Sequence, residues 1–347
     1  MEKIQLIKRP IEQELEAFGK LFQSTLCHAH PLLNEVLAYI RQRNGKMMRP
    51  ILAMLIAKLY GGVNDTTLHA ALSLELLHTA SLVHDDVVDE SDKRRGQLSV
   101  NAIYNNKVSV LVGDYMLATS LKHSALTGHL DIVEQIATLG QDLSEGEIIQ
   151  LANTSNKDFS EEVYFDVIRK KTAALFRVCA SVGAISASMD KEVINKAALF
   201  GEMIGIAFQI KDDIFDYFES EELGKPTGND MAEGKLTLPA LYVLNKLKDE
   251  DLSALALKIR SLDADRDEIS GFIARVKEEG GIAYAEQVMR NYRDKALSLL
   301  PENANPEIRQ ALEAYIDYVI DRTKFTQGNV VPAASKENLL VAGFFLC

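Results

Sequence analysis

Two acidic clusters of the same form lie far apart in the chain. Residues 85–89 and residues 212–216 both follow the pattern D-D-x-x-D, and both belong to strongly apolar segments. On a helix, the first and last aspartates of each cluster stand at i and i+4 and project from one face. Like charges at this spacing destabilise a helix by about 0.2–0.5 kcal/mol per pair. Two such clusters therefore indicate a bound cation.

The ligand chemistry of the clusters favours magnesium. Carboxylates are hard oxygen ligands, and Mg²⁺ is commonly held by one or two of them while its other positions take water and phosphate oxygens. Neither cluster has the loop spacing or the turn glycine of an EF-hand. Basic residues follow both clusters, namely Lys93, Arg94 and Arg95 after the first and Lys225 and Lys235 after the second. Carboxylates, metal and surrounding cations would together form a receptor for a diphosphate group.

A single D-D-x-x-D cluster is more often a solvated acidic face than a metal site. The recurrence of the pattern favours the metal site, and the solvated face stays open as the alternative. The second cluster also continues a polar stripe, since Gln209, Asp212, Asp213 and Asp216 stand at i, i+3, i+4 and i+7.

The segments that carry the clusters are predicted to be helices of an all-α protein. The chain has eight prolines, and none lies between residues 51 and 225. Good helix formers fill that stretch, whereas a strand-rich chain usually needs Pro among its turns. Helical apolar patterns run through 11–24, 31–43, 50–60, 67–90, 99–120, 130–152, 160–188, 192–219, 237–247, 266–277, 282–300 and 306–324.

We expect these helices to form one large domain over residues 1–325. No linker rich in Pro, Gly or Ser divides the chain, and no repeat with a period of 20 to 50 residues occurs. Residues 326–347 have a different composition, with Gly, Asn, Pro and Ser before an apolar end. We interpret them as a tail without an assigned role.

Charge and cysteine usage narrow the setting. The net charge of −12 argues against a broad binding surface for nucleic acid or an anionic bilayer. Cys27, Cys179 and Cys347 are odd in number and widely spaced, which favours neither a disulfide framework nor a thiolate metal site. No run of about 18 apolar residues occurs, so stable membrane insertion is not expected. These features favour a cytoplasmic protein.

Seven strings, in order along the chain, resemble the motifs of one enzyme family. They are Gly45-Lys46-Met47-Met48-Arg49-Pro50, Glu75-Leu76-Leu77-His78 leading to His84-Asp85-Asp86-Val87-Val88-Asp89, Arg94-Arg95-Gly96, Gly113-Asp114-Tyr115, Glu145-Gly146-Glu147 with Gln150, Lys171-Thr172-Ala173 with Phe208-Gln209-Ile210-Lys211-Asp212-Asp213, and Gly234-Lys235-Leu236-Thr237-Leu238-Pro239. Over residues 20–325 the chain resembles the trans-type isoprenyl diphosphate synthases, closest to the long-chain, octaprenyl-like members. One departure is Met47, which stands where the family carries a basic residue.

The resemblance implies an all-α bundle around a central apolar cavity, with two substrate sites. Asp85, Asp89 and Asp212, supported by Asp86 and Asp216, would hold Mg²⁺ against the diphosphate of an allylic primer. Arg94, Lys171, Thr172, Gln209, Lys225 and Lys235 would complete that site. Isopentenyl diphosphate would be bound by Gly45, Lys46, Arg49, His78 and Arg95. Of these residues, Asp85, Asp86, Asp89, Arg94, Lys171, Asp212 and Lys225 are the expected catalytic set.

Two of these residues also have simpler interpretations. Arg94 belongs to a basic pair that is followed by glycine and comes after an acidic helix. Such a sequence often forms a helix C-cap, which the helix macrodipole favours. A histidine within an apolar helix, such as His78, is often a satisfied core residue. His78 nevertheless lies seven residues before Asp85, two turns along nearly the same face, which supports a role in the site.

Product length is expected to depend on the helix face below the first cluster. The residues four and five positions before Asp85 are Ser81 and Ala80, and both are small. Short-chain members that resemble this chain often carry an aromatic residue there. We therefore expect a polyprenyl product longer than C20. Close helix packing is the alternative explanation for small residues at these positions.

Three other functions are weighed against this one. A short-chain farnesyl or geranylgeranyl diphosphate synthase would share every motif except the chain-length positions. A class I terpene cyclase usually lacks a second D-D-x-x-D and needs no isopentenyl diphosphate site. A non-catalytic synthase subunit often loses aspartates from the motifs, and this chain keeps both sets. The apolar segment Val108 to Leu121 resembles the family's dimer interface, so a homodimer is expected, although simple core packing would also explain it.

Overall fold

The computed structural model describes residues 3–42, 45–94, 96–153, 159–188, 190–218 and 227–320. The predicted site residues Arg95 and Lys225 lie outside these ranges, as does the tail over residues 326–347.

The described chain is almost entirely helical, which confirms the all-α prediction. Its first half contains α1 (Lys3–Lys8), the 3₁₀ turn η1 (Arg9–Ile11), α2 (Glu12–Thr25), α3 (Pro31–Gln42), α4 (Met48–Tyr60), α5 (Asp65–Val88), strands β1 (Lys93–Arg94) and β2 (Gln97–Leu98), α6 (Val100–Tyr104), α7 (Asn106–Leu126) and α8 (Leu130–Asn153). Its second half contains α9 (Glu161–Ile168), the π-helical turn η2 (Arg169–Ala173), α10 (Ala174–Ala187), α11 (Lys191–Phe215), α12 (Asn229–Ala232), α13 (Leu238–Leu247), α14 (Glu250–Arg260), α15 (Arg266–Glu278), α16 (Gly281–Ser298) and α17 (Pro306–Ile320).

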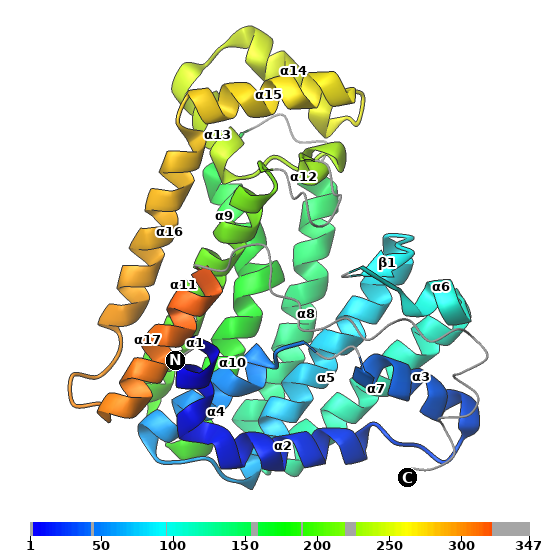
Figure 1. The fold of residues 1–347 in the computed structure, drawn as a ribbon, viewed down its shortest axis with the longest axis vertical. Coiled ribbons are helices and arrows are strands. Elements are labelled where there is room, and N and C mark those ends of the chain that lie inside the picture. The colour runs from blue at the N-terminus through cyan, green and yellow to red at the C-terminus, as the bar shows by residue number, and fades with distance from the viewer. Residues whose placement is uncertain are drawn as a thin grey trace.

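Long helices that pack side by side form the body of the molecule (Figure 1). Helix α5 packs along α7, and α10 packs against both α4 and α11, while α16 covers the other side of α11. Short α1 lies beside α17, so the two ends of the described chain meet. The side chains between these helices form one large buried cluster, which supplies the hydrophobic stabilisation of the bundle.

Helices α13, α14 and α15 form a smaller group at one end of the bundle (Figure 1). They enclose a second buried cluster that includes Tyr217, Met231, Val243, Ile259 and Phe272. Tyr217 follows α11 directly, so the second acidic cluster lies at the junction between the body and this group.

Local sequence signals explain where the two helices that carry the clusters begin. Asn64 caps α5 through a capping box, since Thr67 N donates to Asn64 Oδ1 at 3.0 Å and Asn64 N donates to Thr67 Oγ1 at 3.2 Å. Asp190 caps α11 by accepting the amide of Glu192 at 2.8 Å. Both clusters then fall in the last turn of a long helix, where the chain leaves the bundle.

Several elements differ from the sequence prediction, including α1, α12 and the β1–β2 hairpin, none of which was predicted. The expected helix over 99–120 is broken at Asn105, whose φ of 82° no α-helix can accommodate, and α7 then continues to Leu126. The expected helix over 160–188 contains the π-helical turn η2. Helix α14 was not predicted, although Asp249 caps it by accepting the amides of Asp251 and Leu252.

One described helix, α11, is long and apolar enough to meet the criteria for a membrane span. It packs between α10 and α16, and Phe200, Ile204 and Ile210 on it are buried within the bundle. These contacts are those of a core helix.

Candidate active site

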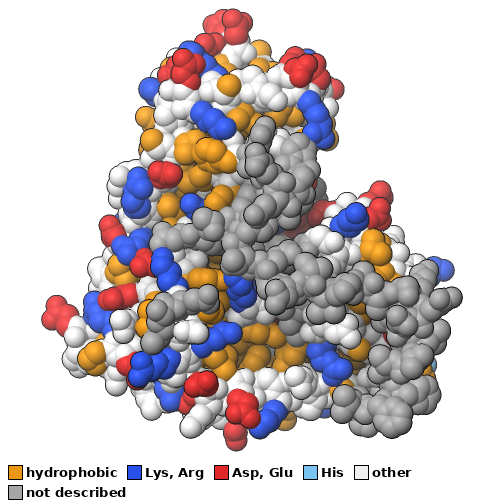
Figure 2. Space-filling model, viewed as in Figure 1, with side chains coloured by type: hydrophobic (Ala, Val, Ile, Leu, Met, Phe, Trp, Pro, Cys, Tyr) orange, Lys and Arg blue, Asp and Glu red, His pale blue; other side chains and the backbone are white. Residues whose placement is uncertain are grey.

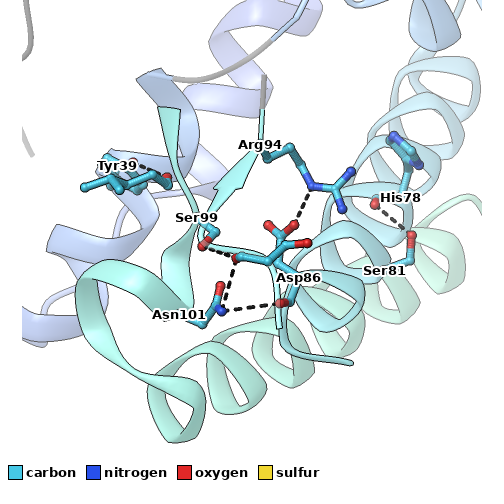
Figure 3. A network of polar contacts seen from close by, with 9 residues as sticks. Tyr39, His78, Ser81, Asp86, Arg94, Ser99 and Asn101 are labelled. Carbon is cyan, nitrogen blue, oxygen red and sulfur yellow. Dashed lines mark hydrogen bonds and ion pairs between the residues drawn. The ribbon is translucent and has the colours of Figure 1, made fainter. Parts of the chain in front are cut away.

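The first acidic cluster has one buried aspartate and two that are more accessible. Asp86 is 3% exposed, and its Oδ1 accepts a hydrogen bond from Arg94 Nε at 2.7 Å (Figure 3). Asp85 is half-buried, and Asp89, at the C-cap of α5, is exposed. Burial raises the pKa of Asp85, and the charge of Glu147 raises it further, while Lys171 and Arg94 lower it. The charge of Asp85 is therefore coupled to Glu147 on α8 and to Lys171 on η2.

A short hairpin holds Arg94 against the end of α5 (Figure 3). Strands β1 and β2 pair in antiparallel register, with Arg94 opposite Gln97. Asn101 Nδ2 donates to the carbonyl oxygens of Asp86 and Ser91, at 3.3 Å each. Ser99 Oγ donates to the same Ser91 oxygen at 2.6 Å. These contacts fix the base of the hairpin, so the Arg94 side chain leaves from a positioned backbone.

The second cluster repeats this arrangement at the end of α11. Asp213 is 3% exposed, and its carboxylate accepts hydrogen bonds from Tyr164 OH at 2.5 Å and from Gln209 Nε2 at 2.8 Å. Burial raises the pKa of Asp213 to about 8, and the charge of Asp230 contributes to the rise. Asp212, next to it, is half-buried. Asp213 is thus an interior anchor, and Asp212 is the more accessible aspartate.

Asp216, the last aspartate of the second cluster, caps a helix. Its two carboxylate oxygens accept the backbone amides of Asn229 and Asp230, each at 3.0 Å. These amides open α12, where a carboxylate is favourable because the N–H groups lack partners within the helix. A carboxylate oxygen can accept more than one contact, so the predicted metal role of Asp216 stays a prediction.

The turn η2 carries two of the predicted binding residues. Lys171 forms an ion pair with Glu147 and donates to Gln150 Oε1 at 3.1 Å. Thr172 Oγ1 donates to Gln209 Oε1 at 2.7 Å, which links η2 to α11. Single π-helical turns inside α-helices are frequent at functional sites, because the extra residue turns side chains out of the regular helical register.

Two glycines let neighbouring backbones approach this turn. A Cβ on Gly205 of α11 would lie 2.5 Å from Ala173 Cα, and a Cβ on Gly146 of α8 would lie 2.9 Å from Lys171 N. Neither distance is sterically possible for a real side chain, so helices α8 and α11 come close to η2 only because these positions are glycine.

Electrostatic coupling links the two clusters across this turn. Glu147 raises the pKa of Asp85, and it also pairs with Lys171. Burial alone would lower the pKa of Lys235, but its hydrogen bond to Glu233 and the charges of Glu233, Asp230 and Glu147 outweigh burial and raise it. Glu147 is therefore within coulombic range of Asp85 in the first cluster and of Lys235 beside the second cluster.

A cavity of about 220 Å³ lies beside the second cluster. Its polar wall includes Lys171, Thr172, Gln209, Asp213 and Lys235, and its apolar wall includes Val163, Val167, Ile168, Leu236 and Leu241. On the surface, a notch separates the upper group of helices from the shoulder that carries β1, with acidic side chains along its rim (Figure 2). Four predicted residues of the allylic site, Lys171, Thr172, Gln209 and Lys235, thus line one space with polar and apolar walls.

A separate group of predicted residues surrounds the start of α4. Arg49 Nη1 lies 3.8 Å from Glu75 Oε2, and the Glu75 side chain is 8% exposed. Arg49 Nε and Glu75 Oε2 are buried, and neither has a hydrogen-bond partner. Buried groups of this kind normally find partners, so their polar atoms are suited to a ligand or water. His78 lies one turn after Glu75 on α5, and Gly45 and Lys46 are exposed just before α4.

Glu75 was not among the residues predicted for the site. It lies three residues before His78, on the same helical face, and this spacing is the sequence signal that could have identified it. Tyr164, which binds Asp213 from a different helix, has no comparable signal.

The two predicted chain-length residues lie on α5. Ala80 is 1% exposed, and Ser81 Oγ donates to the His78 carbonyl oxygen at 2.9 Å. The cavity described above is lined by other residues, so the role of Ala80 and Ser81 stays a prediction.

The donor set of the two clusters fits Mg²⁺. Within the described ranges, no group of three or more His, Cys, Asp or Glu side chains is arranged as a complete metal site. The carboxylates nevertheless repel one another. Burial raises the pKa of Asp85 and of Asp213, and the charge of the neighbouring Asp89 or Asp212 adds to each rise. A divalent cation would relieve this repulsion, and Mg²⁺ needs only one or two carboxylates when phosphate oxygens and water supply the rest. Asp85, Asp89 and Asp212 are the residues that would hold it.

We predict that Gly205→Ala destabilises the protein by about 1–3 kcal/mol, because the new methyl group would overlap the backbone of η2. Gly271→Ala is the matched control, since Gly271 lies in α15 with nothing within 4 Å of an added Cβ. The control should be stabilised by about 0.5–1 kcal/mol. Urea unfolding of the two variants checks this, and equal unfolding midpoints would show that the close approach at η2 is not required.

Comparisons with known proteins point to one family. An octaprenyl diphosphate synthase from Haemophilus influenzae is 36% identical over 296 residues, which cover 84% of this chain and 89% of that protein. The crystal structure of a geranylgeranyl pyrophosphate synthase from Bacteroides thetaiotaomicron is similar with a TM-score of 0.81 at 54% identity, and the match covers 93% of this chain and 100% of that chain. A polyprenyl synthase from Caulobacter crescentus, crystallised with calcium and isoprenyl diphosphate, has a TM-score of 0.83 at 29% identity, over 92% and 98% of the two chains.

The model of the polyprenyl synthetase family matches residues 30–276, a range that contains both acidic clusters, the Arg94 hairpin, η2 and the group around Arg49. On this match and the relatives above, the chain belongs to the polyprenyl synthetase family and is a prenyltransferase.

Proposed function

We propose that the chain condenses isopentenyl diphosphate with an allylic diphosphate, head to tail, in a Mg²⁺-dependent reaction. The observation that carries the proposal is the position of Glu147 and Lys171. The charges of both act on Asp85, the charge of Glu147 also acts on Lys235, and Lys171 lines one cavity with Gln209 and Lys235. A diphosphate placed between the clusters would meet carboxylate-bound metal and ammonium groups together. The calcium and isoprenyl diphosphate in the Caulobacter crescentus structure support this choice of ligands.

The residues of the site have separate tasks in this reaction. Mg²⁺, when bound, supplies positive charge to the allylic diphosphate. Arg94, Lys171 and Lys235 stabilise the negative charge that develops on this group as the allylic carbon–oxygen bond breaks. The double bond of isopentenyl diphosphate then attacks the allylic carbon, and loss of a proton gives a product one isoprene unit longer.

The apolar wall of the cavity keeps this step away from water. Val163, Val167 and Leu236 line the same cavity as the charged groups. Excluding water strengthens the interactions between the diphosphate and the cations, and it protects the allylic cation from hydrolysis.

We propose a product longer than C20, with a short-chain product as the alternative. The small residues Ala80 and Ser81 and the octaprenyl diphosphate synthase relative support the longer product. The 54% identical structure is that of a geranylgeranyl pyrophosphate synthase, which favours the alternative. Product analysis decides between the two.

We also propose a cytoplasmic homodimer. Val110, Leu111, Ala118 and Leu121 are exposed along one face of α7, with 68% of Leu111 and 47% of Leu121 accessible. Apolar side chains exposed together on one helix face are typical of a subunit interface, and the exposed Asp114 lies among them. Cys27 and Cys179 are free thiols, which is compatible with a reducing compartment.

The central test is product formation from farnesyl diphosphate and labelled isopentenyl diphosphate in the presence of Mg²⁺. The wild type should give a ladder of polyprenyl diphosphates, and EDTA should abolish it. Asp212→Asn should lower turnover by about 10²–10³-fold, because the variant loses charge where the metal would bind. Asp267→Asn, an exposed aspartate on α15, is the matched control and should keep full activity. A cyclised hydrocarbon, or turnover that survives EDTA, would contradict the proposal.

For chain length, we predict that Ser81→Phe shortens the product, because an aromatic ring on this face of α5 would block the growing chain. The measurement is the size of the dephosphorylated products on reversed-phase plates. Ala254→Phe places the same ring on an exposed position of α14 and should leave the product unchanged. An unaltered product distribution in Ser81→Phe would assign chain termination to another part of the cavity.

For the oligomeric state, we predict that the double substitution Leu111→Glu with Leu121→Glu halves the mass measured by light scattering, because each charge would have to be buried in the interface. Leu262→Glu is a suitable control, since Leu262 is 65% exposed on a turn after α14. A wild-type protein that is already monomeric would overturn the dimer.

A further inference from the structure

The C-terminal helix α17 reaches the loop that carries Lys46. Tyr315 is fully buried, and its hydroxyl donates to the carbonyl oxygen of Met48 at 3.0 Å. Tyr318 lies one turn further along α17, and its hydroxyl accepts a hydrogen bond from Lys46 Nζ. The same ammonium lies 4.9 Å from the centre of the Tyr318 ring. Two tyrosines on one helix face therefore contact the loop at its backbone and at its functional side chain.

The loop has a backbone conformation that requires external support. Met47 has φ 53° and ψ 37°, in the left-handed region that residues other than glycine rarely adopt. Such conformations persist when surrounding contacts determine them, and they are frequent at binding sites. The Tyr315 contact supplies such a constraint close by, because it holds the Met48–Arg49 peptide at the start of α4, the second peptide after Met47. Lys46 thus leaves from a backbone that α17 holds in place.

The Tyr318 contact suits a lysine that binds a phosphate group. An ammonium at the end of a four-carbon chain is mobile, and holding it in place in advance reduces the entropy lost when an anion binds. A tyrosine hydroxyl accepts from the ammonium without neutralising its charge, whereas a carboxylate would compete with the phosphate. The hydroxyl uses one of the three ammonium donors.

We propose that Tyr318 is a positioning residue for Lys46, so that α17 sets the affinity of the enzyme for the diphosphate of isopentenyl diphosphate. This inference rests on the proposed function, in which Lys46 and Arg49 bind that substrate. It adds a residue from the end of the described chain to a subsite otherwise formed by α4 and α5.

The steady-state constants for the two substrates test this role. Tyr318→Phe keeps the ring and loses the hydroxyl, and it should raise KM for isopentenyl diphosphate by about 3- to 10-fold. Tyr318→Leu loses the same hydroxyl together with the ring and should raise it at least as far. In both variants, KM for the allylic diphosphate and kcat should stay within about twofold of the wild type, because Lys46 does not contact the primer.

Two controls separate positioning from a general effect on folding. Tyr284→Phe removes a hydroxyl that donates to Glu161 at 2.8 Å, far from Lys46 in the sequence and on a different helix, and it should leave both KM values unchanged. In a Lys46→Ala background, Tyr318→Phe should cause no further rise, because its effect passes through Lys46. Calorimetric titration with isopentenyl diphosphate alone should show the same order of affinities.

Three outcomes would overturn the inference. A lower KM for isopentenyl diphosphate in Tyr318→Phe would mean that Tyr318 holds Lys46 away from the substrate. An equal rise in both KM values would indicate a structural role, and an unchanged KM would remove Tyr318 from the subsite. Failure of the proposed function is recognised separately, because the wild type itself would then form no elongated product.

Discussion

The structure depends on placing like charges together at the edge of an apolar core. The ends of α5 and α11 each bring three aspartates to a region where burial raises carboxylate pKa values, as it does for Asp85 and Asp213. Without compensation, buried charges of one sign would oppose folding. The protein compensates with cations from other elements, chiefly Arg94 on the hairpin and Lys171 on η2. The same cations are the groups that a diphosphate would need, so the contacts that stabilise the site also prepare it for the ligand.

Backbone geometry brings these cations within reach. Lys171 belongs to a π-helical turn, and the turn is approached by α8 at Gly146 and by α11 at Gly205. A regular α-helix with ordinary side chains at the two glycine positions would hold the three elements further apart. The coupling between Asp85, Glu147 and Lys171 therefore depends on residues that carry no functional group.

The parts of the site that were predictable from the sequence are those encoded by short-range patterns. The helices that carry both clusters follow from apolar periodicity, and Lys171, Gln209 and Lys235 were identified because each lies in a recognisable string. Contacts made between distant helices have no such pattern. Tyr164 binds Asp213, and Tyr318 binds Lys46, through single side chains on long helices whose sequences give no reason to select them. The short hairpin and α14 were missed because their patterns are too brief or too polar to stand out.

The structure also distinguishes aspartates that the sequence pattern treats alike. In each D-D-x-x-D cluster the second aspartate is 3% exposed and is bound by protein donors, Arg94 for Asp86 and Tyr164 with Gln209 for Asp213. The first aspartate of each cluster is half-buried. Adjacent residues on a helix point about 100° apart, so one aspartate of each pair can be bound by protein donors while its neighbour stays more accessible. The doubled aspartate therefore places a protein-bound anchor next to the aspartate that is proposed to bind the metal. The anchor fixes the rotation of the helix end, and that rotation determines where the ligand carboxylate points.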